Sequence, residues 1–269
     1  MQRRNIFAGL ALVATATLAL AGCAGGSTGA GSGGDAADDP YGLVDAGTLT
    51  VCSDIPYAPF EFEGDNGEYT GFDLDLLGAI AKKLDLKISV QDVGFEALQS
   101  GATLAAGTCD VGASAMTITD DRKKNIDFSE PYYDSLQSLL VRTDSGIKSI
   151  KDLDGKNVGV QQGTTGEAYA KENAKGAQIV QYQGDGDLWP AMQAGQIDAI
   201  LQDQPVNLEH EKADGAYKIV ETYITNESYG FAFEKGTKTK LVEAVNGALK
   251  DLRDSGEYQT IYDTYFTAN

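Results

Sequence analysis

The sequence is poor in the residues that most metal and catalytic centres use. It has one histidine and three cysteines among 269 residues. The lone histidine, His210, can supply neither a pair of imidazole ligands for a metal nor a base for a catalytic triad, and we expect it on an exposed helix. The segment GVQQGTT (159–165) lacks the spacing and the lysine of a phosphate-binding loop. We therefore predict no metal and no cofactor.

Basic residues are also scarce. The chain has 21 Lys and Arg against 40 Asp and Glu, a formal net charge of −19. Such an acidic surface repels nucleic acids and anionic lipid headgroups. We therefore expect no nucleic-acid partner and no direct binding to a membrane surface.

Only one long hydrophobic run is present, at residues 6–22, directly after Arg3 and Arg4. It is shorter than the roughly 20 residues that span a bilayer, and it predicts a signal peptide over residues 1–22. The run ends in LAGC, which resembles the lipobox of bacterial lipoproteins. This resemblance implies a lipid on Cys23 and an extracytoplasmic protein held at the bacterial cell membrane by that anchor only. A secretory signal that ends near an ordinary cysteine is the alternative.

Residues 23–42 are rich in glycine and small polar residues and have little to bury, so we expect a flexible tether. The folded part should begin near Leu43. Only Cys52 and Cys109 then remain, and an extracytoplasmic compartment permits a disulfide between them. We expect it to form, because the first and third strands of a doubly wound lobe are commonly neighbours. Two reduced, buried cysteines are the alternative.

Short apolar strands alternate with helical stretches twice along the chain, which predicts two similar α/β lobes, each a parallel sheet covered by helices on both faces. The segments AGTCDVGAS (106–114) and AGQIDAILQ (194–202) support this repetition, because both end a helix at glycine and enter a strand through an aspartate. The predicted strands are 48–53, 86–93, 109–115, 157–162, 177–182 and 197–203, and the predicted helices are 72–86, 95–107, 165–174 and 187–195.

Ligands of open α/β sheets bind beyond the carboxyl ends of the strands. Those ends hold polar segments at 53–57, 114–122, 162–167 and 202–205. Arg122 offers a planar fork of donors for a carboxylate, with Thr117 beside it. The backbone amides at the start of the helix after Gly163 add to this anion pocket. Asp203, from the other lobe, can bind an ammonium group. Together these groups indicate an α-amino acid as ligand.

Several motifs resemble the family 3 solute-binding proteins, which deliver polar amino acids to ABC importers. They are VCSDIPYAPFEF, GEYTGFDLDLLGAIAKKL, AMTITDDRKKNIDFSEPYY, LDGKNVGVQQGTT and GEYQTIYDTYF, and the likeness covers nearly all of 44–269. It implies a two-lobed type II periplasmic-binding-protein-like fold with lobe 1 at 43–134 and 232–269 and lobe 2 at 135–231. Two crossover strands, near 134–138 and 229–232, would join the lobes. We expect a monomer that contacts an ABC permease.

The resemblance also implies roles for the site residues. Arg122, Thr117 and Thr165 would bind the ligand carboxylate, and Asp203 its amino group. Tyr57 and Phe95 would enclose the ligand side chain, and Asp54 would meet its polar end. The complete expected set is Asp54, Tyr57, Phe95, Ser114, Ala115, Thr117, Arg122, Thr164, Thr165 and Asp203. The sequence departs from the family pattern at 95–111, which is slightly longer, and at Ala115, where glycine or serine is frequent.

Each of these residues also has a purely structural interpretation. Arg122 stands in a charged segment that could be a solvated helix start. Asp54 and Asp203 could be helix caps. Tyr57 and Phe95 could be core residues.

Three classes of function fit the sequence. The first is a non-enzymatic binding protein that captures an amino acid by cleft closure. The second is an extracytoplasmic enzyme on the same fold, similar to cyclohexadienyl dehydratases, and the third is a ligand-sensing module. For a binding protein, the carboxylate of Asp54 would repel an anionic side chain. We therefore expect arginine, lysine, histidine or glutamine rather than glutamate.

Overall fold

The computed structural model describes residues 39–267. The predicted signal peptide, Cys23 and most of the predicted tether lie outside the described residues. Residues 39–42, which the sequence analysis assigned to the tether, form a turn in which the Asp39 carboxylate accepts hydrogen bonds from the backbone amides of residues 41–43.

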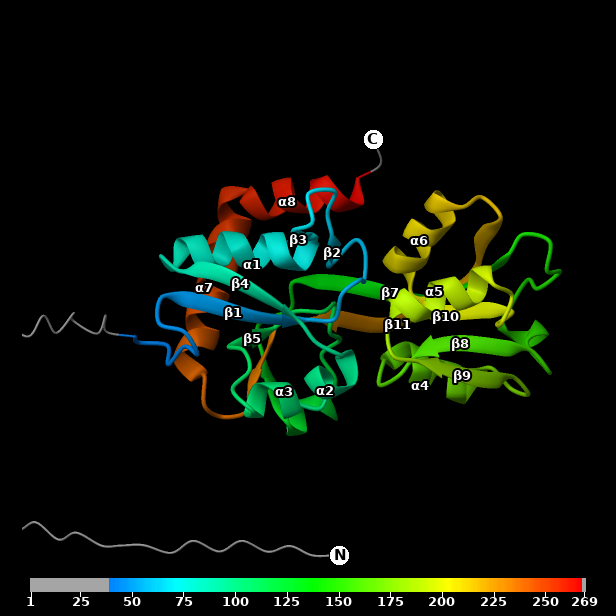
Figure 1. The fold of residues 1–269 in the computed structure, drawn as a ribbon, viewed down its shortest axis with the longest axis horizontal. Helices are drawn as coiled ribbons and strands as arrows, with labels where there is room; N and C mark the ends of the chain where they lie inside the picture. Colours follow the sequence, from blue (N-terminus) through cyan, green and yellow to red (C-terminus); the bar gives the residue numbers. More distant parts are fainter. Residues whose placement is uncertain (1–38, 268–269) are drawn as a thin grey trace, which may run out of the picture. The chain divides into compact units, whose positions relative to one another are not determined.

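The described chain forms two lobes, each built on a five-stranded sheet (Figure 1). In the first sheet β1 lies parallel to β4 and β5, whereas β12 runs antiparallel to β5 and β6. The order across this sheet is β4 (Lys87–Asp92), β1 (Thr48–Ser53), β5 (Val111–Gly112), β12 (Ala232–Glu234) and β6 (Ile126–Phe128). A separate short hairpin is formed by β2 (Phe62–Glu63) and β3 (Tyr69–Thr70).

The second sheet combines a parallel half with two long antiparallel strands. Strand β8 lies parallel to β9 and β10, whereas β7 is antiparallel to both β10 and β11. The order is β11 (Tyr217–Tyr229), β7 (Tyr133–Arg142), β10 (Ala199–Asp203), β8 (Asn157–Gln161) and β9 (Gln178–Tyr182). The parallel arrangement predicted for six strands is confirmed, β1 with β4 and β5 and β8 with β9 and β10. The prediction did not include the strands that pair antiparallel in each sheet, among them β7, β11 and β12.

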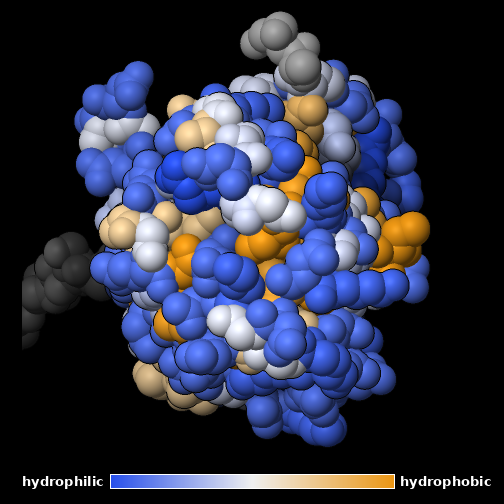
Figure 2. All heavy atoms as spheres, turned by 90° about the vertical axis from the view of Figure 1, so that its right-hand side faces the viewer, coloured by the Kyte–Doolittle hydropathy of each residue, from blue (hydrophilic) through white to orange (hydrophobic). Residues whose placement is uncertain are grey.

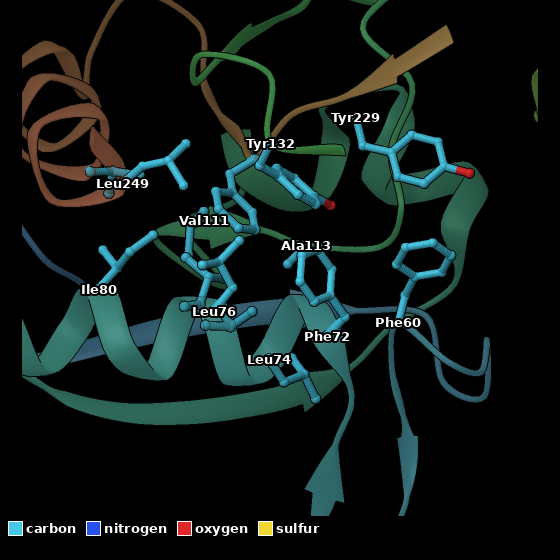
Figure 3. Packing of buried hydrophobic residues seen from close by; sticks show 14 of the residues in the cluster. Phe60, Phe72, Leu74, Leu76, Ile80, Val111, Ala113, Tyr132, Tyr229 and Leu249 are labelled. Carbon is cyan, nitrogen blue, oxygen red and sulfur yellow. The ribbon is translucent and has the colours of Figure 1, made fainter. Parts of the chain in front are cut away.

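Helices cover both faces of the first sheet. Because neighbouring residues of a strand point to opposite faces, Val51 joins the core with α1 and α7, whereas Cys52 joins the core with α2 and α3. Figure 3 shows the first of these cores, in which Leu76 and Ile80 of α1 face Leu249 and Val111. The helices of lobe 1 are α1 (Phe72–Lys83), α2 (Phe95–Gln99), α3 (Ala102–Ala105), α7 (Thr239–Ser255) and α8 (Glu257–Phe266). Those of lobe 2 are α4 (Thr165–Asn173), α5 (Asp185–Gln193) and α6 (Gln204–Ala213), and the 3-10 turns are η1 (Arg122–Lys124) and η2 (Ile150–Asp152).

The helix predicted over 95–107 is divided at Gly101 into α2 and α3. Gly101 has a φ of 83°, and a Cβ there would lie 3.0 Å from the carbonyl oxygen of Asn125. The chain therefore needs glycine at a close approach to the loop that leads into β6, and this tertiary contact interrupts the helical pattern.

The repeated segments at 106–114 and 194–202 form the same structure in both lobes. In each one a glycine adopts a positive φ, 68° at Gly107 and 70° at Gly195. The aspartate that follows then accepts a hydrogen bond from the amide of a neighbouring strand, Asp110 from Thr50 and Asp198 from Asn157. In both lobes the repeated segment thus links the end of a helix to a neighbouring parallel strand through the aspartate side chain.

The two longest strands, β7 and β11, pair with each other from Arg142 and Tyr217 to Tyr133 and Tyr229. Tyr229 is fully buried in the core of lobe 1 (Figure 3), whereas Leu139 of β7 is buried in a core of lobe 2. The strands therefore join the lobes.

On the face shown in Figure 2 hydrophilic residues predominate and apolar ones lie in scattered patches. Within residues 39–267 no helix has the length and hydrophobicity to cross a membrane. The same range contains no group of three or more His, Cys, Asp and Glu side chains placed to hold a metal ion.

The structure contains the predicted disulfide between Cys52 and Cys109, with Cα atoms 5.8 Å apart. It joins the end of β1 to the segment before β5 and belongs to a buried cluster with Phe95 and Leu98 of α2. The bridge therefore supports the part of lobe 1 from which Phe95 extends.

Reduction of this disulfide should lower the free energy of unfolding by about 3 to 4 kcal/mol, because the bridge closes a loop of 57 residues. Urea unfolding of the oxidised and the reduced protein measures the difference. Cys52→Ala/Cys109→Ala is the control and should not respond to reductant. Two free thiols in the intact mass of secreted, unreduced protein would contradict the assignment.

Candidate functional site

The carboxyl ends of parallel strands from both lobes meet around one pocket. Strands β1 and β5 of lobe 1 and strands β8 and β10 of lobe 2 all end there. The pocket is narrow, with a cavity volume of about 10 Å³. It is lined by all ten residues of the predicted set and by one further residue: Asp54, Tyr57, Phe95, Ser114, Ala115, Thr117, Arg122, Gln161, Thr164, Thr165 and Asp203.

Arg122 points into this pocket although its neighbours in sequence are charged and exposed. Its side chain is 5% exposed. Nη1 donates to the Thr117 carbonyl at 2.8 Å and Nη2 to the Gly163 carbonyl of the other lobe at 3.0 Å. The guanidinium carbon lies 5.1 Å from the ring centre of Phe95, a cation–π contact. These contacts exclude the interpretation of Arg122 as part of a solvated surface.

Burial lowers the pKa of Arg122 to about 10, because it disfavours the charged form, while the charges of Asp203 and Glu227 act in the opposite direction. Arg122 therefore remains a cation at neutral pH. A guanidinium has five N–H donors, and three of those of Arg122 are used by Thr117, Gly163 and, through Nε at 3.5 Å, Gln99. Two donors remain for an anion.

Asp203 lies at the end of β10 and is almost fully buried. Its carboxylate accepts hydrogen bonds from the Tyr57 hydroxyl of lobe 1 at 2.9 Å and from the Gln137 amide at 2.5 Å. Gln137 stands opposite Asp203 in the β7–β10 register. Although Asp203 directly precedes α6 at its N-cap position, its side chain makes no capping hydrogen bond. Burial raises the pKa of Asp203 to about 7, and the charge of Glu227 adds to the shift.

Asp54 follows β1 and faces the opposite lobe. It accepts a hydrogen bond from the Gln161 amide at 2.5 Å. Burial raises its pKa to about 7, in part offset by this bond, and the nearby carboxylates of Asp92 and Asp185 add to the rise. The pocket thus places an acidic group from each lobe opposite the single cation, Arg122.

Tyr57 and Phe95 are both core residues and pocket residues. Tyr57 is 7% and Phe95 5% exposed, and each belongs to a hydrophobic cluster of lobe 1. Both also line the pocket. Thr164 has a helix-capping role, because its hydroxyl accepts the Glu167 amide at 3.1 Å at the start of α4.

Glu227, a buried carboxylate behind the pocket, was not among the predicted site residues. It accepts hydrogen bonds from the Thr117 hydroxyl at 2.9 Å and from the Thr165 hydroxyl at 2.8 Å. Because each hydroxyl has a single proton, both can only accept hydrogen bonds on the pocket side. The site loop lies close to Glu227 because residue 117 forms a β-bridge with Tyr229 at the end of β11.

Gln137 and Gln161 were also missed. Gln137 and Glu227 lie inside strands that pair antiparallel, whereas site residues were expected only at the carboxyl ends of parallel strands. Gln161 is the last residue of β8. It stands one position before the polar segment 162–167, in which site residues were expected.

His210 was predicted on an exposed helix, and this was wrong. The residue is 9% exposed, its Nε2 lies 2.9 Å from Asp185 Oδ1, and its ring stacks on Trp189 with centroids 4.2 Å apart. His210 lies four residues after the buried Val206 on α6, so both occupy the helix face that packs inward.

Comparisons with known proteins agree with this architecture. The model of the bacterial extracellular solute-binding proteins, family 3, matches residues 49–268. The L-cystine-binding protein TcyJ of Escherichia coli (strain K12) is 33% identical over 230 residues, covering 84% of this chain and 85% of the relative. The arginine-binding extracellular protein ArtP of Bacillus subtilis (strain 168) is 33% identical over 262 residues, covering 96% of each chain.

A similar solved structure is that of the ancestral amino acid-binding protein AncCDT-1, described as a precursor of cyclohexadienyl dehydratase. It is 38% identical, with a TM-score of 0.76, and the match covers 82% of this chain and 96% of that one. The family model spans most of the sequence, and both relatives exceed 30% identity over more than four fifths of their length. The chain therefore belongs to the bacterial extracellular solute-binding proteins of family 3, as its motifs predicted.

Proposed function

We propose that the protein captures a polar amino acid between its two lobes outside the cytoplasm and delivers it to the permease of an ABC importer. One observation carries this proposal. A buried guanidinium, Arg122, and a buried carboxylate from the other lobe, Asp203, line the same pocket. An α-amino acid has the complementary pair of charges. The relatives named for binding cystine and arginine support the same class of ligand.

In this proposal the two free donors of Arg122 bind the ligand carboxylate, together with backbone amides at the start of α4 near Thr165. Asp203 binds the ammonium group. The hydroxyls of Thr117 and Thr165 assist Asp203 rather than Arg122, because their protons are directed to Glu227. This assignment changes the role expected for Thr117, because its hydroxyl proton is used by Glu227 and cannot also be donated to the ligand carboxylate.

The side chain of the ligand would then lie between Tyr57 and Phe95 and reach toward Asp54. Acidic groups predominate there, since Asp92 and Asp185 both act on the pKa of Asp54. A cationic or amide side chain is favoured by these charges, and a guanidinium or flat amide can also stack on the rings. We therefore rank arginine, lysine, histidine and glutamine above glutamate.

Capture would proceed by closure of lobe 1 (43–134 and 232–269) onto lobe 2 (135–231), with bending near 134–138 and 229–232. Hydrogen bonds of site residues already join the lobes, among them those of Tyr57 to Asp203, Arg122 to the Gly163 carbonyl, Gln161 to Asp54 and Thr117 to Glu227. Because site residues make these bonds, a ligand that contacts the same groups is coupled directly to closure. We further propose a monomer anchored through a lipid on Cys23.

An enzyme of the dehydratase type is the second candidate, and the likeness to AncCDT-1 favours it. Both curated relatives described above are named for binding rather than for catalysis, which favours the transport role. Incubation with prephenate or arogenate separates the two, because turnover of either compound would establish the enzyme.

Replacement of Arg122 by alanine should weaken binding of L-arginine by about 2 to 5 kcal/mol, because the ligand carboxylate would lose its charged partner. Arg122→Lys keeps the charge but loses the planar fork, and its affinity should fall between those of the wild type and Arg122→Ala. Calorimetric titration of each purified protein measures the effect.

The exposed neighbour Lys123 offers a matched control, and Lys123→Ala should bind as the wild type does. Circular dichroism and unfolding of each variant show whether it is folded. If folded Arg122→Ala binds L-arginine as tightly as the wild type, Arg122 is not part of the site and the proposed ligand class loses its main support.

Binding of L-arginine should strengthen as pH rises from about 5.5 to 8, since burial raises the pKa of both Asp54 and Asp203 to about 7 and their ionised forms attract the cationic ligand. Asp54→Asn should make the pH profile shallower, because one of the two titrating groups is gone. A flat wild-type profile over this range would exclude ionisation of these carboxyls as a determinant of affinity.

A further inference from the structure

Two fully buried carboxylic acids, Glu61 and Asp73, lie beneath the floor of the pocket. Both residues are 0% exposed. Glu61 follows Phe60 in the loop after β1, and Asp73 stands in the first turn of α1. The amide of Asp73 donates to the Phe60 carbonyl at 3.0 Å, which brings the two acids together beside the aromatic core formed by Phe60 and Phe72 (Figure 3).

Each acid holds one residue of the pocket floor. The Ser114 hydroxyl donates to Glu61 Oε1 at 2.7 Å, and the Ala115 amide donates to Asp73 Oδ2 at 2.9 Å. Ala115 has a φ of 42°, a left-handed conformation that non-glycine residues adopt only when the surrounding structure imposes it. The bond to Asp73 is part of that constraint, so the shape of the floor depends on this acid.

The second oxygen of each acid lacks a partner. Glu61 Oε2 and Asp73 Oδ1 are buried without a hydrogen bond to any described residue. The other hydrogen bond to the Asp73 carboxylate from the described residues comes from the Tyr132 hydroxyl, which donates to Oδ2 at 2.6 Å. No lysine or arginine of residues 39–267 forms an ion pair with either acid.

The titratable groups around the pair cannot neutralise two negative charges. The charges of Asp54 and Asp203 raise the pKa of Glu61, and the charge of Glu61 raises the pKa of Tyr57 and Tyr132. All four neighbours are acids or phenols, so none of them supplies a positive charge. Burial raises the pKa of Glu61, and the charge of Asp73 raises it further. Burial also raises the pKa of Asp73, opposed by the bonds from Tyr132 and Ala115. Two buried carboxylates with no cation nearby are strongly unfavourable, and such pairs retain a proton.

We propose that Glu61 and Asp73 together retain one proton, and that this buried pair positions Ser114 and Ala115 in the ligand pocket. With the proton present, the pair carries a single negative charge. Loss of the proton leaves two buried carboxylates without a cation, which repel each other and displace the floor. The inference rests on the proposed function, because it assigns the pair to the same site.

The pH dependence of stability gives a test that needs no ligand. Both acids have a raised pKa in the folded state, so the folded protein binds more protons than the unfolded chain above the ordinary pKa of these groups. The free energy of unfolding must therefore fall as pH rises from the ordinary pKa of these groups toward their raised pKa in the folded state. Glu61→Gln and Asp73→Asn each replace one of the two acids by a neutral amide, so neither variant retains the shared proton.

Urea unfolding of the wild type, both variants and the double variant should be measured between about pH 5 and 8. The unfolding constant of the wild type should rise at least about tenfold relative to that of either single variant over this range, since one pKa unit corresponds to tenfold. The double variant should add no second tenfold change, because only one proton is lost. Glu63→Gln, an exposed neighbour, should follow the wild-type profile. Profiles of the single variants parallel to that of the wild type would overturn the proposal.

If the single variants fail to fold, carboxyl ¹³C NMR of the wild type decides the question. A carboxyl group that remains protonated near pH 7 supports the pair, and two fully ionised groups at about pH 6 overturn it. Calorimetry with L-arginine tests the link to the site, where the affinity of folded Glu61→Gln relative to the wild type should increase with pH. A constant ratio would overturn the positioning role. If L-arginine binds to none of the proteins while the stability profiles differ as expected, the ligand class is wrong and the proton-sharing pair stands.

Discussion

The buried guanidinium of Arg122 is the feature around which the site is organised. A charge in this position needs partners from several elements, and the chain supplies them with the Phe95 ring, the Thr117 carbonyl and the Gly163 carbonyl of the other lobe. Phe95 in turn packs against the Cys52–Cys109 disulfide. The bridge, the short helix α2 and the contact between the lobes therefore all contribute to holding one cation in place.

Negative charge surrounds that cation. Asp54, Asp203 and Glu227 lie at or behind the pocket, and the pKa of the first two is raised by burial. An α-amino acid with a cationic side chain carries a net positive charge, so its binding would relieve repulsion that the site otherwise contains. The same excess of acid explains why the hydroxyls of Thr117 and Thr165 face a carboxylate behind the pocket. The electrostatics of this cleft thus favour a cationic ligand over an anionic one.

Sequence reasoning could place the groups that stand at the carboxyl ends of parallel strands. The strand ends and the alternating pattern led to Arg122, Thr117 and Asp203, because the geometry of parallel sheets brings such ends to one edge. The two-lobed fold followed from the repeated alternation of strands and helices, and the family motifs implied it as well. The site residues at the strand ends and the two lobes needed only local pattern and general topology.

The remaining features depend on tertiary contacts that no local pattern reveals. Glu227 and Gln137 reach the site from antiparallel strands, where position in the strand gives no signal of function. Gly101 interrupts a helical pattern because the loop before β6 passes too close for a side chain. His210 sits in a charged sequence, yet Trp189 and Asp185 cover it.

The most direct test is a thermal-shift screen of residues 24–269 against each of the common amino acids. A ligand at 100 times its dissociation constant stabilises a protein by about 2.7 kcal/mol, which raises the melting temperature measurably. We predict the largest shifts with arginine, lysine, histidine or glutamine, and little or no shift with glutamate. No shift with any amino acid, or the largest shift with glutamate or aspartate, would contradict the assignment of this pocket to a cationic or amide amino acid.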